Sequence, residues 1–189
     1  GTKPKIVAAL SDAKVTAGRD VTLRCEIRAG EPRASCRWFK DAKELYGGSR
    51  KHTLAYSDDV ATLTIHGAEL ADAATYRCEA DNKVGRVDTQ ATLTVMAAPE
   101  IAIESGSDRV SVKAGALVLM SASVSGFPTP SLSWRHNGKA LEQAANVKVD
   151  VNVDVTSVSI KGSAARNGGK YELVATNEVG EATAEFNVV

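Results

Sequence analysis

The sequence contains the same set of landmarks twice. Residues from the first half of the chain return in the second half at a nearly constant spacing of 95 to 97 positions. The repeated landmarks are Ala17-Gly18 and Ala114-Gly115, Trp38 and Trp134, Tyr76 and Tyr171, and Asn82–Gly85 and Asn177–Gly180. A fixed spacing of this kind indicates two copies of one domain rather than one domain with an insertion. We therefore expect domain 1 over residues 1–96 and domain 2 over residues 97–189. The boundary is expected near Pro99, whose missing N–H suits the start of a strand.

Apolar and polar residues alternate in several short segments of each copy. In domain 1 these are Val21–Ile27, Ala61–Ile65, Tyr76–Ala80 and Ala91–Val95, and in domain 2 they are Val118–Val124, Val147–Val155 and Ala184–Val188. Such alternation predicts strands with one buried face, and no segment has a convincing period of 3.6 residues. The sequence therefore predicts an all-β protein, and half-buried strands in domains of this size favour β-sandwiches.

Composition excludes several classes of protein. The 189 residues include 23 basic and 23 acidic side chains, so the formal net charge is zero. Proteins that bind nucleic acids usually carry a strong excess of basic residues. The hydrophobic content of 43% is too high for a disordered chain. The sequence has no run of about 18 apolar residues, so no membrane span is predicted. We therefore expect a folded protein with no nucleic-acid partner and no membrane partner.

The sequence has no recognisable motif of catalysis or metal binding. The three histidines are scattered, without the spacing of a zinc site: His52, His66 and His136. Asp150, Asn152 and Asp154 share one side of an expected strand, and ligands arranged in that way do not surround a calcium ion. No nucleophile elbow, phosphate-binding loop or dinucleotide motif is present. We therefore predict a protein that is not an enzyme and that has no cofactor and no metal site.

The order and spacing of four residues resemble those of immunoglobulin domains. In domain 1, Trp38 follows Cys25 by 13 positions, and Tyr76 stands two positions before Cys78, as in sandwiches with a core tryptophan beside two facing cysteines. The segment Gly126–Pro130 of domain 2 is similar to the signature that precedes the tryptophan in this family. Tryptophan and tyrosine are 38 residues apart in domain 1 and 37 in domain 2, which leaves room for three short strands. The resemblance is to intermediate-set (I-set) domains, and it implies two immunoglobulin-like (I-set) β-sandwiches in tandem.

The resemblance also implies a structural core. Its members are Cys25, Cys36, Trp38, Tyr76 and Cys78 in domain 1, and Trp134 and Tyr171 in domain 2. A disulfide between Cys25 and Cys78 is a candidate, and two buried thiols are the alternative that we favour for a cytosolic protein. Because Cys36 lies two positions before Trp38, it points into the same core. Oxidation that lets these three cysteines exchange partners is one hypothesis, and a small apolar role for Cys36 is the simpler alternative.

Domain 2 contains no cysteine. The positions that correspond to Cys25 and Cys78 hold Ala122 and Leu173. A small domain without this bridge is typical of a reducing compartment. None of the seven asparagines lies in an N-x-S/T sequon for glycosylation. We therefore expect a cytoplasmic protein.

Tandem I-set domains of this kind are similar to segments of intracellular giant muscle proteins of the titin, twitchin and obscurin kind. The resemblance implies a non-enzymatic structural and protein-interaction tandem in the sarcomere or myofibril, which acts as a mechanical spacer and a docking platform. The implied partners are other sarcomeric or cytoskeletal proteins, bound through edge strands or end-to-end contacts. One alternative is a fragment of an extracellular cell-adhesion protein or receptor ectodomain, and another is a regulatory segment beside a giant muscle kinase.

A mechanical role requires that the first and last strands of each domain pair. We expect Lys5–Leu10 to pair with Ala91–Val95, and Ile101–Ile103 to pair with Glu185–Val189. A short linker, Met96–Ala98, is expected to join the two sandwiches end to end.

The charged residues of domain 1 are expected to form ion pairs rather than a basic patch. Arg24 and Arg37 belong to opposite sheets, whereas Glu26, Glu79 and Asp81 face outward, so we expect cross-strand ion pairs. Domain 1 has a net charge of +2 and domain 2 of −2. Phe39 and Tyr46 are expected as exposed contact points on domain 1.

Overall fold

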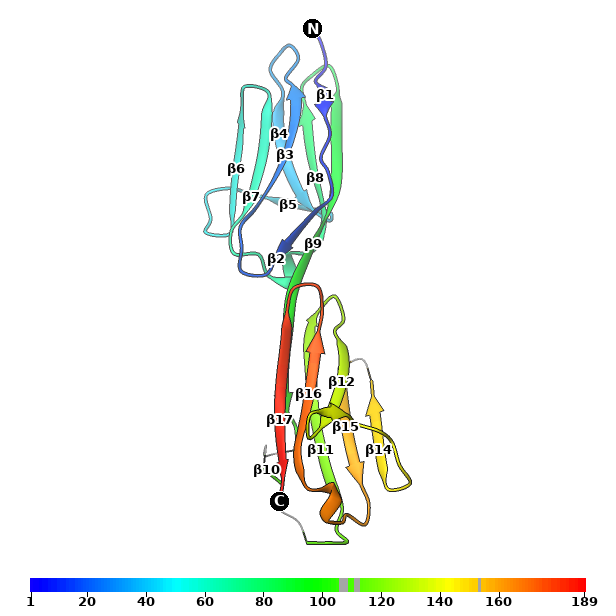
Figure 1. Ribbon diagram of the computed structural model, residues 1–189. Helices are drawn as coiled ribbons and strands as arrows, with labels where there is room; N and C mark the ends of the chain where they lie inside the picture. Colours follow the sequence, from blue (N-terminus) through cyan, green and yellow to red (C-terminus); the bar gives the residue numbers. More distant parts are fainter. Residues whose placement is uncertain (106–108, 111–112, 153) are drawn as a thin grey trace. The chain divides into compact units, whose positions relative to one another are not determined.

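The computed structural model describes residues 1–105, 109–110, 113–152 and 154–189. The described residues form strands and two single turns of 3-10 helix, without an α-helix. The chain divides into two compact units, Gly1–Met96 and Ala97–Val189, called domain 1 and domain 2 below. Both are β-sandwiches, so the predicted all-β class is confirmed (Figure 1).

Domain 1 is built from two layers of mainly antiparallel strands. One layer has the strand order β1-β3-β7-β6, and the other has β9-β8-β4-β5 with β2 beside β9. The bounds are β1 Lys5–Ala8, β2 Ala13–Thr16, β3 Val21–Arg28, β4 Ser35–Lys40, β5 Lys43–Leu45, β6 His52–Ser57, β7 Val60–Ile65, η1 Leu70–Asp72, β8 Ala74–Asp81 and β9 Arg86–Ile103. Alternate residues of β3, β7 and β8 fill the space between the layers, as the period of two predicts.

Domain 2 repeats this arrangement. One layer contains the second half of β9 with β11, β15 and β14, and the other has the order β10-β17-β16-β12-β13. The bounds are β10 Arg109–Val110, β11 Val118–Phe127, β12 Ser131–His136, β13 Lys139–Ala140, β14 Val147–Val151, β15 Val155–Ile160, η2 Ala165–Asn167, β16 Gly169–Thr176 and β17 Glu181–Val188. Strand β9 is continuous through Met96–Ala98, so the expected linker has extended backbone.

The first strand of each domain is broken, which corrects both expected terminal pairings. Strand β1 pairs with β3, and it is the later strand β2 that pairs in parallel with β9 at Leu93–Met96. In domain 2, Ile101–Ile103 pairs with β11, and the two residues of β10 pair in parallel with Asn187–Val188. The reason is that the segment crosses from one layer to the other, so its two halves have different partners.

The alternating run Val147–Val155 is not one strand. It forms the hairpin of β14 and β15, with the N–H of Asn152 donating to the carbonyl of Val155 at 2.8 Å. Val151 and Val155 are exposed at the end of the hairpin where the two strands are joined. Asparagine and aspartate favour turns, and the valine repeat concealed that turn. Val153 lies outside the described residues.

Two tyrosines fasten the same corner in each domain. The Tyr76 hydroxyl donates to the Asp72 carbonyl at 2.6 Å, and the Tyr171 hydroxyl donates to the Asn167 carbonyl at 2.7 Å. Both are tyrosine corners, in which a buried hydroxyl bonds the backbone a few residues upstream. Burial raises the pKa of both phenols, so both hydroxyls keep the proton that they donate.

Domain 2 replaces the cysteine pair with packing and one buried hydrogen bond. Ala122 and Leu173 are fully buried in its core, with Met120, Tyr171 and Phe186 around them. The indole N–H of Trp134 donates to Thr156 Oγ1 at 2.9 Å, and that hydroxyl donates to the Asp150 carbonyl at 2.8 Å. The buried indole N–H therefore has a hydrogen-bond partner in a core that contains no cysteine.

Candidate interaction face

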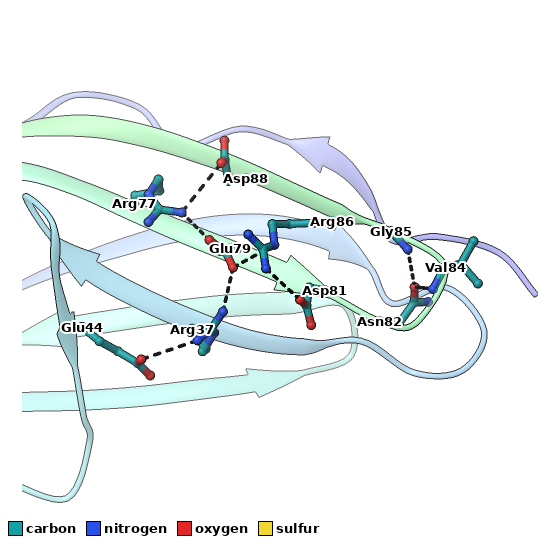
Figure 2. Close-up of polar contacts among 10 residues, drawn as sticks. All are labelled: Arg37, Glu44, Arg77, Glu79, Asp81, Asn82, Val84, Gly85, Arg86 and Asp88. Carbon is teal, nitrogen blue, oxygen red and sulfur yellow. Dashed lines mark hydrogen bonds and ion pairs between the residues drawn. The ribbon is translucent and has the colours of Figure 1, made fainter.

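A buried glutamate organises the outer face of the β9-β8-β4-β5 layer of domain 1. Glu79 lies in the middle of β8 and is only 4% exposed, although its side chain points away from the core. Arg37 Nη2 on β4 lies 2.9 Å from Oε1, Arg86 Nε on β9 lies 3.2 Å from the same oxygen, and Arg77 Nη1 on β8 bonds Oε2. Figure 2 shows the three guanidinium groups converging from three strands on this one carboxylate.

A second ring of carboxylates surrounds the three arginines. Arg37 pairs with Glu44 at 3.6 Å, and Arg77 pairs with Asp88 at 3.7 Å. Arg86 pairs with Asp81 at 3.4 Å (Figure 2). Three cations thus face four carboxylates, so the face presents a paired charge network rather than a basic patch. The cross-strand ion pairs predicted for Glu79 and Asp81 are confirmed, whereas Glu26 pairs with Arg24 of its own strand.

The network fixes the protonation state of Glu79. Burial alone raises the pKa of this carboxyl, but the hydrogen bonds from Arg77 and Arg37, together with the charges of Arg86 and Arg77, outweigh burial and lower the pKa below its usual value. Glu79 is therefore ionised at neutral pH. It therefore acts as a fixed negative charge toward the three guanidinium groups.

Phe39 lies under this lattice. The guanidinium carbon of Arg77 lies 4.2 Å from the centroid of the Phe39 ring, and that of Arg37 lies 5.6 Å from it. Both distances are within the range of cation–π contacts, so the Phe39 ring helps to hold the two arginines in place. Phe39 is consequently half-covered rather than a free contact point, whereas Tyr46 is exposed to 70% as expected.

The turn at the end of this face is held by one asparagine. Asn82 Oδ1 accepts the N–H groups of Val84 and Gly85 at 2.9 and 3.1 Å (Figure 2). Its Nδ2 donates to the carbonyls of Thr2 and Pro32, both at 2.8 Å. Asn177 makes the corresponding four bonds in domain 2. Val84 is thus an exposed apolar side chain on a rigid turn.

The described residues of domain 2 contain no glutamate-centred network of this kind. The repeat aligns Glu79 with Val174, and it aligns Arg37 and Arg86 with Ser133 and Glu181. The equivalent face carries a smaller cluster in which Lys170 Nζ lies 3.7 Å from Glu172 and 3.5 Å from Glu185. The network is therefore a property of domain 1 and not of the shared fold.

The three cysteines lie together beneath this layer as free thiols. Cys25 and Cys78 are fully buried, and Cys36 is partly buried against the same core. Interactions with the thiols of Cys25 and Cys36, together with burial, raise the pKa of Cys78, whereas the interaction with Cys78 lowers the pKa of Cys25 and that of Cys36. A protonated, buried thiol is a poor nucleophile, so Cys78 is the least reactive of the three cysteines at neutral pH.

The remaining sequence-predicted core residues are Trp38, Tyr76, Trp134 and Tyr171, and all four are buried. They contribute no surface to bind a partner. Sequence reasoning missed Glu79 as an organising residue. Two residues could have indicated this role: Arg77, two positions before Glu79 on the same strand, and Arg37, directly opposite Glu79 on β4.

The described part of the chain contains no group of three or more His, Cys, Asp or Glu side chains arranged to hold a metal ion. It also contains no helix of the length and apolarity required to cross a membrane.

Comparison with known proteins identifies the repeated unit. A family model described as the Immunoglobulin I-set domain matches residues 4–95 and 101–189. The chain is 28% identical to the human SPEG neighbor protein over 94% of this chain and 73% of that protein. It is 30% identical to the muscle M-line assembly protein unc-89 of Caenorhabditis elegans over 98% of this chain and 2% of that protein.

The chain is also similar to one further curated protein and to one solved structure. Hemicentin-2 of Mus musculus is 29% identical over 93% of this chain and 3% of that protein. A solved two-domain titin fragment, Titin-A168169, superposes with a TM-score of 0.79 over 98% of this chain and 97% of the fragment, at 22% identity. That likeness shows a shared fold.

Proposed function

The chain belongs to the immunoglobulin I-set family, and we propose that it is a non-enzymatic interaction tandem of a sarcomeric or cytoskeletal protein. In this role it is a mechanical spacer and a docking platform. Its partners are other sarcomeric or cytoskeletal proteins. Similarity to a muscle M-line assembly protein supports this assignment. The chain spans only 2% of that protein, so the rest of such a molecule supplies its other functions.

The observation that carries the mechanical role is the parallel pairing of terminal strands. In domain 1, Ala13–Thr16 of β2 pairs in parallel with Leu93–Met96 of β9. Tension that draws β2 toward its N-terminus and β9 toward its C-terminus slides the two strands past each other. Every hydrogen bond of the pair is then loaded at once rather than one after another. The parallel pair β10 and β17 supplies the same geometry in domain 2.

Single-molecule force spectroscopy on the full chain tests this role. The N–H of Ala17 donates to the Met96 carbonyl, so the alternate residue Val15 also directs its N–H toward β9, and Lys14 directs its N–H away. Val15→Pro removes a ladder donor, and we expect a lower unfolding force for one of the two domains. Lys14→Pro keeps the ladder and is the control for the proline ring, and Val15→Ala keeps the ladder and is the control for the loss of the buried Val15 side chain. An unfolding force of Val15→Pro equal to that of either control would refute the shear mechanism.

The cytoplasmic, sarcomeric location is supported by the cysteine distribution. Domain 2 holds its core with Leu173 and the Trp134–Thr156 hydrogen bond, without cysteine. Such a core suits a compartment in which disulfides do not persist. Antibody labelling of muscle sections tests the location, and staining confined to the matrix outside the cells would contradict it.

A second candidate function is an extracellular adhesion fragment. Cys25 and Cys78 occupy the positions at which immunoglobulin domains form their bridge, and the similarity to hemicentin-2 favours this candidate. The test is to denature the protein as isolated from tissue, alkylate it and measure its mass. Three alkylated cysteines support the cytoplasmic assignment, and one supports the extracellular alternative.

A further inference from the structure

Each domain has a groove at the same place, between its first strand and its last strand. The groove of domain 1 has a volume of about 710 Å³ and is lined by Thr2–Ile6 and by Val87 and Asp88. The groove of domain 2 has a volume of about 730 Å³ and is lined by Pro99–Ala102, by residues 123–125 and by Asp154, Ala182 and Thr183. Because Pro4 and Pro99 are 95 positions apart, the two grooves are equivalent parts of the repeat.

The two grooves carry opposite charges. In domain 1 the charged lining residues are Lys3, Lys5 and Asp88, and Asp88 is already paired with Arg77. In domain 2 they are Glu100 and Asp154, and no basic side chain lines the groove. Within the described residues neither carboxylate has an ion-pair partner. Lys5 and Glu100 are equivalent in the repeat, so the charge is reversed at one and the same position.

The groove of domain 2 also presents an open strand edge. Val189 directs its N–H to the Val110 carbonyl at the outer edge of β17, whereas Gly180 accepts from Asn177 on the inner side. Backbone groups of alternate residues share an edge in a strand. Glu181 and Thr183 therefore direct N–H and C=O outward. Residues 181–184 pair with β16 on their inner side. Strand β10 pairs only with Asn187–Val188, so in the described part of the chain the outer edge of residues 181–184 has no ladder partner.

We propose that this groove binds an extended basic segment of a partner protein. The segment adds as a strand to β17 at residues 181–184, and main-chain hydrogen bonds to Glu181 and Thr183 supply the register. Lysine or arginine side chains on the groove side of the segment pair with Glu100 and Asp154. Strand addition of this type takes affinity from the backbone and specificity from alternate side chains. The inference rests on the proposed interaction role and assigns it a site and a ligand chemistry.

The test uses the full chain and two labelled peptides of eight residues, one alternating lysine with threonine and the other alternating glutamate with threonine. Fluorescence anisotropy measures binding at low and high salt. We expect the basic peptide to bind more tightly than the acidic one, and more weakly as salt screens the pairing. The double variant Glu100→Lys with Asp154→Lys is expected to weaken binding of the basic peptide by about tenfold or more. The matched control, Lys3→Glu with Lys5→Glu, leaves domain 2 unchanged and keeps the affinity of this groove.

Two readouts separate strand addition from simple charge attraction. Amide hydrogen exchange followed by NMR is expected to slow at Glu181 and Thr183 when the basic peptide binds. A basic peptide that is N-methylated at alternate residues lacks the donors and is expected to bind weakly. Unchanged exchange at both amides, or full binding by the methylated peptide, would overturn strand addition. Equal binding to the wild type and the double variant would overturn the site. Circular dichroism of each variant verifies folding, and the force experiment on β2 does not involve this groove, so the two proposals fail independently.

Discussion

Replacing Glu79 with glutamine tests whether the charge network stabilises domain 1. Glutamine has nearly the same shape, keeps one acceptor oxygen and directs an NH₂ group at a guanidinium. Hydrogen bonds to charged groups contribute about 1.5–3 kcal/mol when buried, whereas exposed ion pairs contribute about 0–1 kcal/mol. The side chains of Arg37 and Arg86 are 44% and 60% exposed, and that of Arg77 is 27% exposed. The contacts of Glu79 with Arg37 and Arg86 are therefore weak, and its contact with Arg77 is stronger. We expect Glu79→Gln to lower the free energy of unfolding of domain 1 by about 2 kcal/mol.

Urea denaturation with pulsed hydrogen exchange and mass spectrometry measures this loss in each domain separately. For a domain of this size a loss of about 2 kcal/mol lowers the urea midpoint by about 1 M. The loss is expected in peptides from β8, and peptides from β16 are expected to keep their midpoint. Glu172→Gln is the matched control, because Glu172 lies on β16, and its pair with Lys170 has the geometry of a surface ion pair. It should change the stability of domain 2 by less than about 0.5 kcal/mol.

The effect of Glu79→Gln also has a definite pH dependence. Because the pKa of Glu79 is lower in the folded state than in the unfolded chain, its stabilising contribution is fully present above the unfolded pKa of about 4.3. The contribution is lost as the pH falls through the lower, folded pKa. The stability difference between wild type and variant should therefore be constant near neutrality and shrink below about pH 4. An equal difference at pH 7 and pH 3 would show that the loss comes from shape or packing, and it would refute the electrostatic account.

Three further substitutions probe the parts that hold each sandwich together. Thr156→Val removes the acceptor of the buried Trp134 indole, and thermal unfolding should show domain 2 destabilised by about 1–3 kcal/mol. Leu173→Ala opens a cavity where a cysteine stands in domain 1, and urea unfolding should show a loss of about 3–5 kcal/mol in domain 2. Asn82→Ala releases the turn that carries Val84, and amide exchange there should accelerate while the core of domain 2 exchanges at its wild-type rate.

The repeat and the period of two were sufficient to predict the sandwich class, because burial of alternate side chains is a local property of each strand. The predicted pairing of the first strand was wrong because pairing is not a local property. Lys5–Ala8 and Ala13–Thr16 have similar composition, and only the crossing between layers decides that β1 joins β3 and β2 joins β9. Partner choice depends on distant residues, which a local pattern does not contain.

The candidate face was predictable in outline only. Outward alternation placed Glu79 and Asp81 on one side of β8, so ion pairs were expected. The near-complete burial of Glu79 was not expected, because the side chains that cover it come from three different strands, β4, β8 and β9. An exposed position in a strand pattern becomes buried when three long side chains converge on it, and only the register of the sheet reveals that convergence.

The two domains therefore differ in the interactions that they can form with a partner. On domain 1 the charges of the Glu79 face are already paired with one another, so a ligand that uses charge must first break existing ion pairs and gains little net energy. On domain 2, Glu100 and Asp154 have no partner in the described structure, and the edge of β17 has unused backbone donors and acceptors. A ligand in this groove can therefore form both ion pairs and backbone hydrogen bonds without breaking existing ones. It follows that salt should weaken binding at domain 2 much more than binding at the Glu79 face, where recognition must depend on shape.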